Sequence, residues 1–280
     1  MSFINFLHTF NPSPILVTIG PINIYWYGFF ILLATLTSLA AAVYLAKFYN
    51  LKADVIIDLA FWLIIFGLIG ARIYDIFLEL PYFLANPINI FKVWRGGLAI
   101  HGAVIGGGLT LYLFAKKYRH NFWQLAAILT AVLPLAQAIG RWGNYFNQEL
   151  FGYPTNLAWG IPIELIHRPL IYFNNQYFHP AFLYESLGNL VIFLILIILQ
   201  IWIIKKRKFT TTNYIFSAIS YVFLYSSLRF FTEFIRIDTT PTALGLRFPQ
   251  LVSLPIILVS LGYFTYFIWL KVKRNKTLDN

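Results

Sequence analysis

The sequence predicts an all-α integral membrane protein with about seven transmembrane helices. Of its 280 residues, 59% are hydrophobic and only 11% are charged, whereas about a quarter of the residues in a soluble domain carry charge. The apolar residues form long unbroken runs and do not alternate with polar ones, and a backbone in lipid must satisfy its own hydrogen bonds. We therefore expect a single transmembrane helical domain over residues 1–280.

Seven apolar runs are long enough to cross a membrane, because a hydrocarbon core about 30 Å thick takes about 20 helical residues. They cover residues 24–44, 55–76, 98–115, 122–143, 181–204, 214–235 and 249–270. Residues 1–23 contain three prolines and no lysine or arginine, so they lack the basic region of a signal peptide. We expect them to lie along the membrane interface, and residues 145–180 to form a loop region on the outer side.

The basic residues indicate the orientation of the chain. Thirteen of the twenty-one adjoin the same ends of the predicted spans, which marks that side as cytoplasmic. These are Lys47, Lys52, Lys116, Lys117, Arg119, Lys205, Lys206, Arg207, Lys208, Lys271, Lys273, Arg274 and Lys276. With seven spans, the N-terminus is then outside and the C-terminus is cytoplasmic.

The outer half has a different charge pattern. It holds Lys92, seven arginines and seven of the ten acidic residues. The arginines are Arg72, Arg95, Arg141, Arg168, Arg229, Arg236 and Arg247, and the acids are Asp75, Glu79, Glu149, Glu164, Glu185, Glu233 and Asp238. Topology needs only positive charge, but binding a phosphate or carboxylate through two parallel hydrogen bonds needs a guanidinium group. The outer half is therefore expected to bind an anion.

The sixth run carries charged residues inside the predicted membrane. Arg229 lies about 22 Å above the cytoplasmic start of the run at 1.5 Å per residue. Glu233 and Arg236 follow at spacings of four and seven, which predicts one charged stripe on a helix. Ionisable groups in lipid mark functional sites by default. The alternative is that Glu233 only neutralises an arginine for folding or topology.

The fourth run ends in a polar segment, residues 140–152, with the sequence GRWGNYFNQELFG. Arg141 and Asn144 are three residues apart and share a face if the helix continues. Glu149 and Gly152 fall in the turn that follows. A helix cap with interfacial aromatic residues would explain part of this segment, but not an arginine, two asparagines and a glutamate together.

His101 begins the third run, just inside the predicted outer boundary. A lone histidine in such a place is more often structural than catalytic, but an imidazole titrates near neutrality and is the usual general base. Gly102 and Gly106 are spaced for close helix packing, and the alternative is a slot for an acyl chain or headgroup. Tyr27, in the first run, is either an interfacial aromatic residue or directs its hydroxyl inward.

Composition excludes several kinds of chemistry. The chain has no cysteine, so it forms no disulfide and has no thiolate nucleophile. The histidines form no helical pair of metal ligands, and no GxSxG serine motif occurs. The net charge of +11 would suggest nucleic-acid binding in a soluble protein, but here most of the basic residues set the orientation. We expect no metal, no cofactor and no nucleic-acid partner.

The outer-half residues suit an anionic phospholipid headgroup as substrate. A group transfer on such a lipid needs cations that hold the phosphate and stabilise it as it leaves. It also needs a base for the incoming nucleophile.

These motifs resemble those of bacterial prolipoprotein diacylglyceryl transferases. Residues 140–152 match every fixed position of that family's pattern G-R-x-G-N-F/Y-x-N-x-E-x-x-G. Further similar blocks follow in the same order along the chain, at 26–28, 95–102, 179–185 and 229–236. Residues 156–177 match no pattern of the family and are expected to form at most a lid or a peptide-docking surface.

The resemblance implies a multi-pass enzyme of the bacterial inner (plasma) membrane, with seven helices and an active site on the periplasmic side. Its substrates would be phosphatidylglycerol and the lipobox cysteine of a prolipoprotein signal peptide, with membrane lipids around it. The diacylglyceryl group would move onto the cysteine thiol as a thioether, with release of glycerol 1-phosphate. The only thiol in this reaction then belongs to the substrate.

The resemblance also assigns roles to individual residues. Arg141 and Arg229 would bracket the lipid phosphate, and His101 would be the candidate base. The substrate-binding residues would be Tyr27, Asn144, Glu149, Gly152, Glu233 and Arg236, of which Glu233 and Arg236 would support Arg229.

Two other functions are open from the residues alone. A lipid or anion transporter would also use outer arginines, although transporter sites usually lie near the midplane between repeated halves, and no repeat is visible here. A structural membrane subunit would leave the arginine-rich outer half unexplained.

Overall fold

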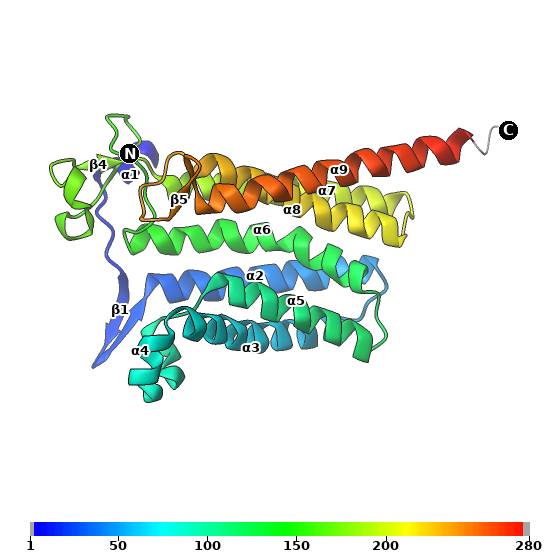
Figure 1. Ribbon diagram of the computed structural model, residues 1–280, viewed down its shortest axis with the longest axis horizontal. Helices are drawn as coiled ribbons and strands as arrows, with labels where there is room; N and C mark the ends of the chain where they lie inside the picture. The colour runs from blue at the N-terminus through cyan, green and yellow to red at the C-terminus, as the bar shows by residue number, and fades with distance from the viewer. Residues whose placement is uncertain (1–2, 277–280) are drawn as a thin grey trace. The chain divides into compact units, whose positions relative to one another are not determined.

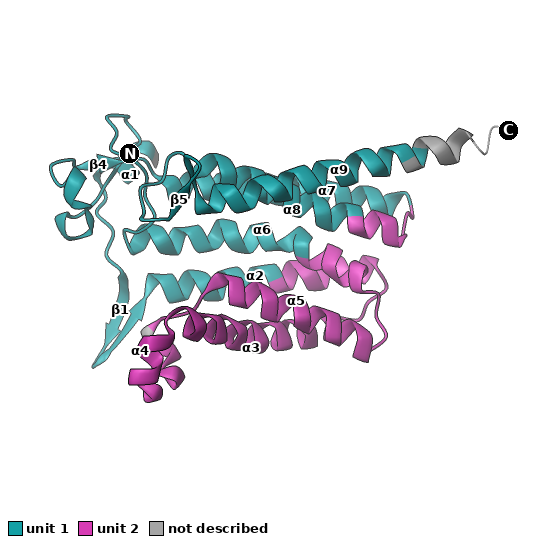
Figure 2. Ribbon diagram, in the orientation of Figure 1, with its two compact units in different colours: residues 1–38, 130–206, 216–280 teal, residues 39–129, 207–215 magenta. Residues whose placement is uncertain are grey.

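The computed structural model describes residues 3–276 and is mostly helical (Figure 1). Residues 1–2 and 277–280, which belong to the predicted interfacial segment and cytoplasmic end, lie outside the described residues. The chain forms two compact units (Figure 2). Unit 1 contains residues 1–38, 130–206 and 216–280, and unit 2 contains residues 39–129 and 207–215.

Six helices among the described residues are long and apolar enough to cross a membrane. They are Trp26–Phe48, Ala53–Leu78, Phe122–Phe146, Ala181–Lys205, Thr211–Thr232 and Phe248–Trp269. They coincide with six of the seven predicted runs, and the chain is a multi-pass, mostly helical membrane protein.

The remaining predicted run, 98–115, also forms a helix, α5 (Ile100–Lys117). It is not among the six candidate spans. Glycines, a histidine and two terminal lysines keep its 18 residues below the hydropathy that the six candidate spans reach. The count of seven spans therefore stays a prediction.

Unit 2 is built around the close packing of two helices, α3 (Ala53–Leu78) and α5. A Cβ atom on Gly102 would lie 2.1 Å from the Gly70 carbonyl oxygen, and one on Gly106 would lie 2.5 Å from that of Phe66. Glycine is required at both positions because the two backbones nearly touch. The packing interpretation of this glycine pair is therefore correct.

Between α3 and α5 the chain forms short helical elements, α4 (Leu80–Ala85), η1 (Pro87–Phe91) and η2 (Val93–Arg95). Arg72 of α3 is buried beneath them. Its guanidinium donates to the carbonyl of Ile90 at 2.9 Å, to those of Gly96 and Gly97 at 2.9 and 2.7 Å, and to that of Asn89. Arg72 thus holds the segment that leads into α5.

Replacing Arg72 with lysine should destabilise the protein by at least about 2 kcal/mol, because an ammonium keeps the charge but not the fork of donors. Thermal unfolding in detergent, together with proteolysis of residues 86–97, measures the effect. Arg119→Lys, at an exposed arginine in the same unit, is the matched control. Equal stability of the two variants would show that the guanidinium fork does not hold this segment.

Unit 1 contains all or most of each of the other candidate spans. Ser186 of α7 (Ala181–Lys205) donates to the Ala138 carbonyl of α6 (Phe122–Phe146) at 2.8 Å. Gln200 of α7 donates to Ser217 of α8 (Thr211–Thr232) at 2.8 Å. The Phe216 ring of α8 stacks on α9 (Phe248–Lys276). Ser186 and Gln200 are thus buried polar side chains that meet partners on neighbouring helices, which lowers the cost of a polar group in lipid.

Unit 1 has a small hydrophobic core that includes residues outside its long helices. It joins α1 (Phe3–Thr9) to the loop region between α6 and α7. Its buried members are Leu7, Tyr145, Phe151, Ile161, Ile163, Phe178 and Phe182. The predicted interfacial segment thus packs partly against residues 145–180, and an interfacial position for it stays a prediction.

Three two-stranded antiparallel ribbons occur among the described residues of unit 1. They pair β1 (Ile15–Ile19) with β2 (Ile22–Tyr25), β3 (Ile161–Pro162) with β4 (Tyr177–Phe178), and β5 (Thr242–Ala243) with β6 (Leu246–Arg247).

Candidate active site

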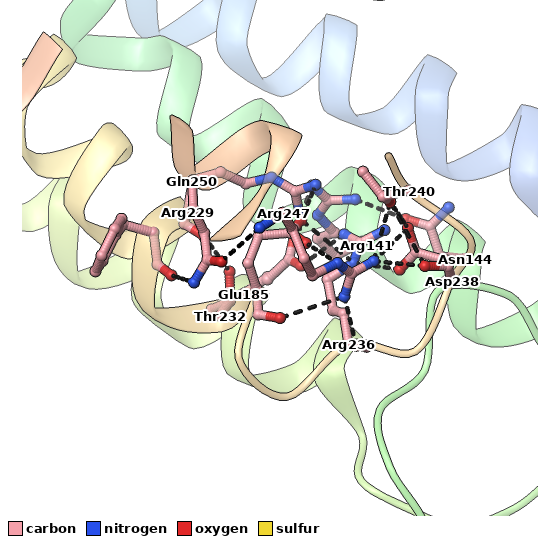
Figure 3. A network of polar contacts seen from close by, with 12 residues as sticks. Arg141, Asn144, Glu185, Arg229, Thr232, Arg236, Asp238, Thr240, Arg247 and Gln250 are labelled. Atoms are coloured by element: carbon pink, nitrogen blue, oxygen red, sulfur yellow. Dashed lines mark hydrogen bonds and ion pairs between the residues drawn. The ribbon is translucent and has the colours of Figure 1, made fainter. Parts of the chain in front are cut away.

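Four arginines and three carboxylates of unit 1 converge in one network (Figure 3). Arg141 comes from α6, Glu185 from α7 and Arg229 from α8. The other members follow α8, and they are Glu233, Arg236, Asp238 and Arg247.

Glu185 lies at the centre of this network. Its side chain is 4% exposed, and its carboxylate pairs with Arg141 at 2.6 Å, with Arg236 at 2.9 Å and with Arg229 at 3.4 Å. A buried carboxylate is stable only when it is paired and hydrogen-bonded. Glu185 therefore holds Arg141 together with Arg229 and Arg236, which lie far from Arg141 in the sequence.

The prediction of a charged stripe on one helix is wrong. Helix α8 ends at Thr232, so Glu233 and Arg236 lie beyond it. The backbone of Arg236 forms an antiparallel bridge with Gly152, and the amide of Tyr153 donates to the Ile235 carbonyl at 2.9 Å. Pairing with the loop after α6 thus replaces the helical hydrogen bonds at this point.

The side chains of that segment still meet Arg229. Glu233 is fully buried and pairs with Arg229, and its other oxygen lies 3.1 Å from Nε of Arg247. Arg236 donates from Nε to Asp238 at 2.8 Å. The tertiary fold therefore places Glu233 beside Arg229, as the helical spacing was expected to do.

Arg247 ties the segment after α8 into a closed loop. Its guanidinium donates to the carbonyl of Glu233 at 3.2 Å, to the carbonyl of Asp238 at 2.5 Å and to the hydroxyl of Thr240 at 3.0 Å. It also donates to the Arg236 carbonyl. Arg247 therefore shapes the backbone that carries Glu233 and Arg236.

The ion pairs of this loop favour the ionised forms of the Asp238 and Arg236 side chains. Burial alone would raise the pKa of Asp238, but hydrogen bonds from Arg236 and Thr240 and the charges of Arg236 and Arg247 hold it below its usual value. Burial alone would lower the pKa of Arg236, but Asp238, Glu185 and Glu233 together raise it. Both groups stay charged near neutral pH.

The end of α6 is arranged as its sequence predicts. The helix continues to Phe146, so Arg141 and Asn144 share a face and Arg141 donates to the Asn144 side chain at 3.2 Å. Asn144 donates in turn to Glu149 at 2.7 Å. Tyr27 packs against the same helix, because a Cβ on Gly143 would lie 2.9 Å from its ring.

Gly152 lies at a close contact between two segments, and its role in substrate binding stays a prediction. A Cβ atom there would lie 2.7 Å from Cγ2 of Ile235, 2.8 Å from Cβ of His179 and 2.9 Å from the Ile235 carbonyl oxygen. The space is filled by protein on these sides. Gly152 therefore acts by letting the loop after α6 approach the segment after α8.

Gly152→Ala should lower stability by about 1–3 kcal/mol and reduce activity, because the added methyl forces these two segments apart. Gly140→Ala, in the same sequence motif, is the control, since a Cβ there meets nothing within 4 Å. Thermal unfolding of both variants separates the two cases. A Gly152→Ala protein as stable as the control would contradict the close-approach role.

His101 lies in unit 2, in the first turn of α5. It is exposed. Its ring centroid is 5.8 Å from that of Tyr74, at an angle of 34°. The structure thus places His101 on a helix whose start is held by Arg72, and its role as a base stays a prediction.

The network in unit 1 is suited to bind an anion. The side chains of Arg141 and Arg229 are 21% and 20% exposed, whereas those of Glu185 and Glu233 are 4% and 0% exposed. Two partly accessible guanidinium groups are therefore paired with buried carboxylates, which fix their positions. No cluster of three or more histidine, aspartate or glutamate residues that could hold a metal occurs among residues 3–276.

The role assignment from the sequence missed Glu185, Asp238 and Arg247. All three belong to the outer-half charges, so their types gave a signal. Sequence spacing does not reveal the contacts of Glu185, because its partners Arg229 and Arg236 lie 44 and 51 positions away.

Comparison with known proteins identifies the family. The sequence model described as "Prolipoprotein diacylglyceryl transferase" matches residues 14–266. The chain belongs to the prolipoprotein diacylglyceryl transferase family. The resemblance deduced from residues 140–152 and the other blocks is thereby confirmed.

Relatives within the prolipoprotein diacylglyceryl transferase family are similar over nearly the whole chain. The phosphatidylglycerol–prolipoprotein diacylglyceryl transferase of a Nostoc species is 42% identical over 275 residues, covering 98% of this chain and 94% of its own. That of Synechococcus elongatus is 40% identical, and the match covers 88% of this chain and 84% of the relative. That of Staphylococcus aureus is 36% identical, covering 91% and 88%. The charged network of unit 1 lies wholly within the part that matches the family.

Proposed function

We propose that this chain transfers the diacylglyceryl group of phosphatidylglycerol to the lipobox cysteine of a prolipoprotein, the first step of bacterial lipoprotein maturation. The proposal rests on one observation above all. In a chain of this family, the accessible guanidinium groups of Arg141 and Arg229 share the buried carboxylate of Glu185. Paired, oriented arginines are what a phosphodiester headgroup requires.

The reaction forms one bond and breaks another. The thiolate sulfur attacks the glyceryl carbon that bears the phosphate ester, so a C–S bond forms and the C–O bond to the phosphate breaks. Glycerol 1-phosphate leaves with the bonding electrons. Arg141 and Arg229 stabilise the negative charge that grows on the departing phosphate. His101 accepts the proton of the thiol.

The remaining site residues position these groups. Glu233 and Arg236 hold Arg229, and Asn144 with Glu149 fixes the guanidinium of Arg141. Tyr27 lines the headgroup pocket beside them, and Gly152 lets the two loops that frame it approach each other.

The membrane arrangement belongs to the same proposal. We place α5 across the membrane as the seventh span of a single transmembrane domain, with the N-terminus outside and the C-terminus in the cytoplasm. The thirteen basic residues on one side support this orientation. Residues 145–180 and the charged network then face the periplasmic side of the inner membrane, where prolipoproteins and membrane lipids meet the enzyme.

The test uses purified protein in liposomes that contain phosphatidylglycerol, with a lipobox peptide as acceptor. Mass spectrometry should find a thioether-linked diacylglyceryl group on the peptide cysteine, and none on a peptide with serine at that position. Arg141→Ala should abolish the product. Wild-type activity in that variant would refute the site, and lipid movement without any covalent product would favour a transporter.

A further inference from the structure

Unit 2 contains an apolar groove that the proposed function does not use. It runs between α3 and α5 and has a volume of about 640 Å³. Its walls include Phe66, Ile73, Leu109 and Leu113. The groove exists because the glycines at the contact of the two helices bring the backbones together without filling the space beside them.

The length of the groove suits one lipid acyl chain. Its α5 wall extends from Gly102 to Lys117, which corresponds to about 22 Å at 1.5 Å per residue. One leaflet of a bilayer contributes roughly 15 Å of hydrocarbon, half of the whole core. An acyl chain that enters at one end of the groove therefore finds apolar walls over its full depth in that leaflet.

One end of the groove carries a positive charge. Among the described residues that line the groove, Lys117 is the only lysine, arginine, aspartate or glutamate. Its ammonium lies 5.3 Å from the ring centroid of Tyr118, which also lines the groove. Lysine beside an apolar surface keeps its stem on that surface and its charge at the headgroup level. Such a lysine attracts an anionic headgroup.

We propose that this groove holds an acyl chain of an anionic glycerophospholipid whose phosphate pairs with the Lys117 ammonium. The lipid comes from the leaflet on the side that the basic residues mark as cytoplasmic. The phosphate position at Lys117 is separate from the proposed chemistry, because His101 and Lys117 lie in the first and last turns of α5. The lipid is bound there and is not transformed.

The experiment uses the full-length protein in phosphatidylcholine nanodiscs with a trace of photoreactive lipid. The probe is phosphatidylserine with a diazirine in its acyl chain, which avoids the proposed substrate, and phosphatidylcholine with the same acyl chain is the comparison lipid. Peptide mass spectrometry maps the labelled residues. We expect phosphatidylserine to label groove residues such as Leu109 and Leu113 about fivefold more than phosphatidylcholine does, the factor that one lysine charge near the surface supplies.

Two matched pairs of variants locate the site. Lys117→Gln should reduce phosphatidylserine labelling to the phosphatidylcholine level, whereas Lys116→Gln, at the neighbouring exposed lysine outside the lining, should leave it unchanged. Leu109→Trp should block labelling by both lipids, whereas Val104→Trp, at an exposed position outside the lining, should not.

Three results would overturn the proposal. These are equal labelling by the two lipids in the wild type, equal loss in the two lysine variants, and full labelling of Leu113 in Leu109→Trp. Diacylglyceryl transfer is assayed on the same samples as a separate readout. Failure of transfer with intact groove labelling counts against the proposed function alone.

Discussion

Replacing His101 with glutamine should lower the rate of transfer at saturating substrate by about 10²- to 10⁴-fold, the usual contribution of a general base. Glutamine keeps much of the size of the imidazole and some of its hydrogen bonding, but it does not accept a proton near neutral pH. Because His101 is exposed in the first turn of α5, the fold should remain intact. Steady-state kinetics and thermal unfolding of the same preparation measure both quantities.

His167→Gln is the matched control, since His167 lies in the loop region and has no assigned role. It should retain wild-type turnover. Wild-type turnover in a well-folded His101→Gln protein would remove this residue from the base role.

Glu185→Gln should both inactivate and destabilise the protein. The carboxylate pairs with three arginines and its side chain is 4% exposed. Removing one partner of a buried ion pair leaves uncompensated charge and costs about 3–5 kcal/mol. Without Glu185, Arg141 and Arg229 lose their common anchor, so phosphate binding and turnover should fall together.

Glu164→Gln is the control for this variant, because Glu164 is an exposed acid of the loop region after α6. Among the described residues, its carboxylate accepts a hydrogen bond only from Asn11, at 2.8 Å. Its unfolding temperature and activity should stay near those of the wild type. If Glu185→Gln matches it in both, the carboxylate does not organise the site.

The long helices were predictable because hydrophobic length is a local property of the sequence. Six of the predicted runs coincide with candidate spans. The seventh, α5, shows the limit of this signal. Gly102 and Gly106 of α5 pack against Gly70 and Phe66 of α3. Such glycines allow close helix contact, but they lower the mean hydropathy of the helix.

The end of α8 shows where periodicity misleads. The spacing of Arg229, Glu233 and Arg236 fits a helical stripe, but the helix ends at Thr232. The backbone of Arg236 pairs with Gly152 instead. That partner lies far away in the sequence, and no local pattern signals such a contact.

Glu185 and Arg247 illustrate the same limit in the candidate site. The motif at 140–152 identified Arg141, Asn144 and Glu149 because these residues are neighbours on one helix end and its following turn. Glu185, on α7, joins α6, α8 and the segment after α8 through its side chain alone. Only the tertiary structure brings such residues together.

The most direct test of the account is the stoichiometry of the reaction in phosphatidylglycerol liposomes. The amounts of glycerol 1-phosphate released and of thioether formed on the lipobox peptide are measured over the same time course. The account predicts equal amounts of the two products and neither product without the cysteine peptide. Release of glycerol 1-phosphate without thioether, which indicates hydrolysis, or no release at all by the folded protein would contradict it.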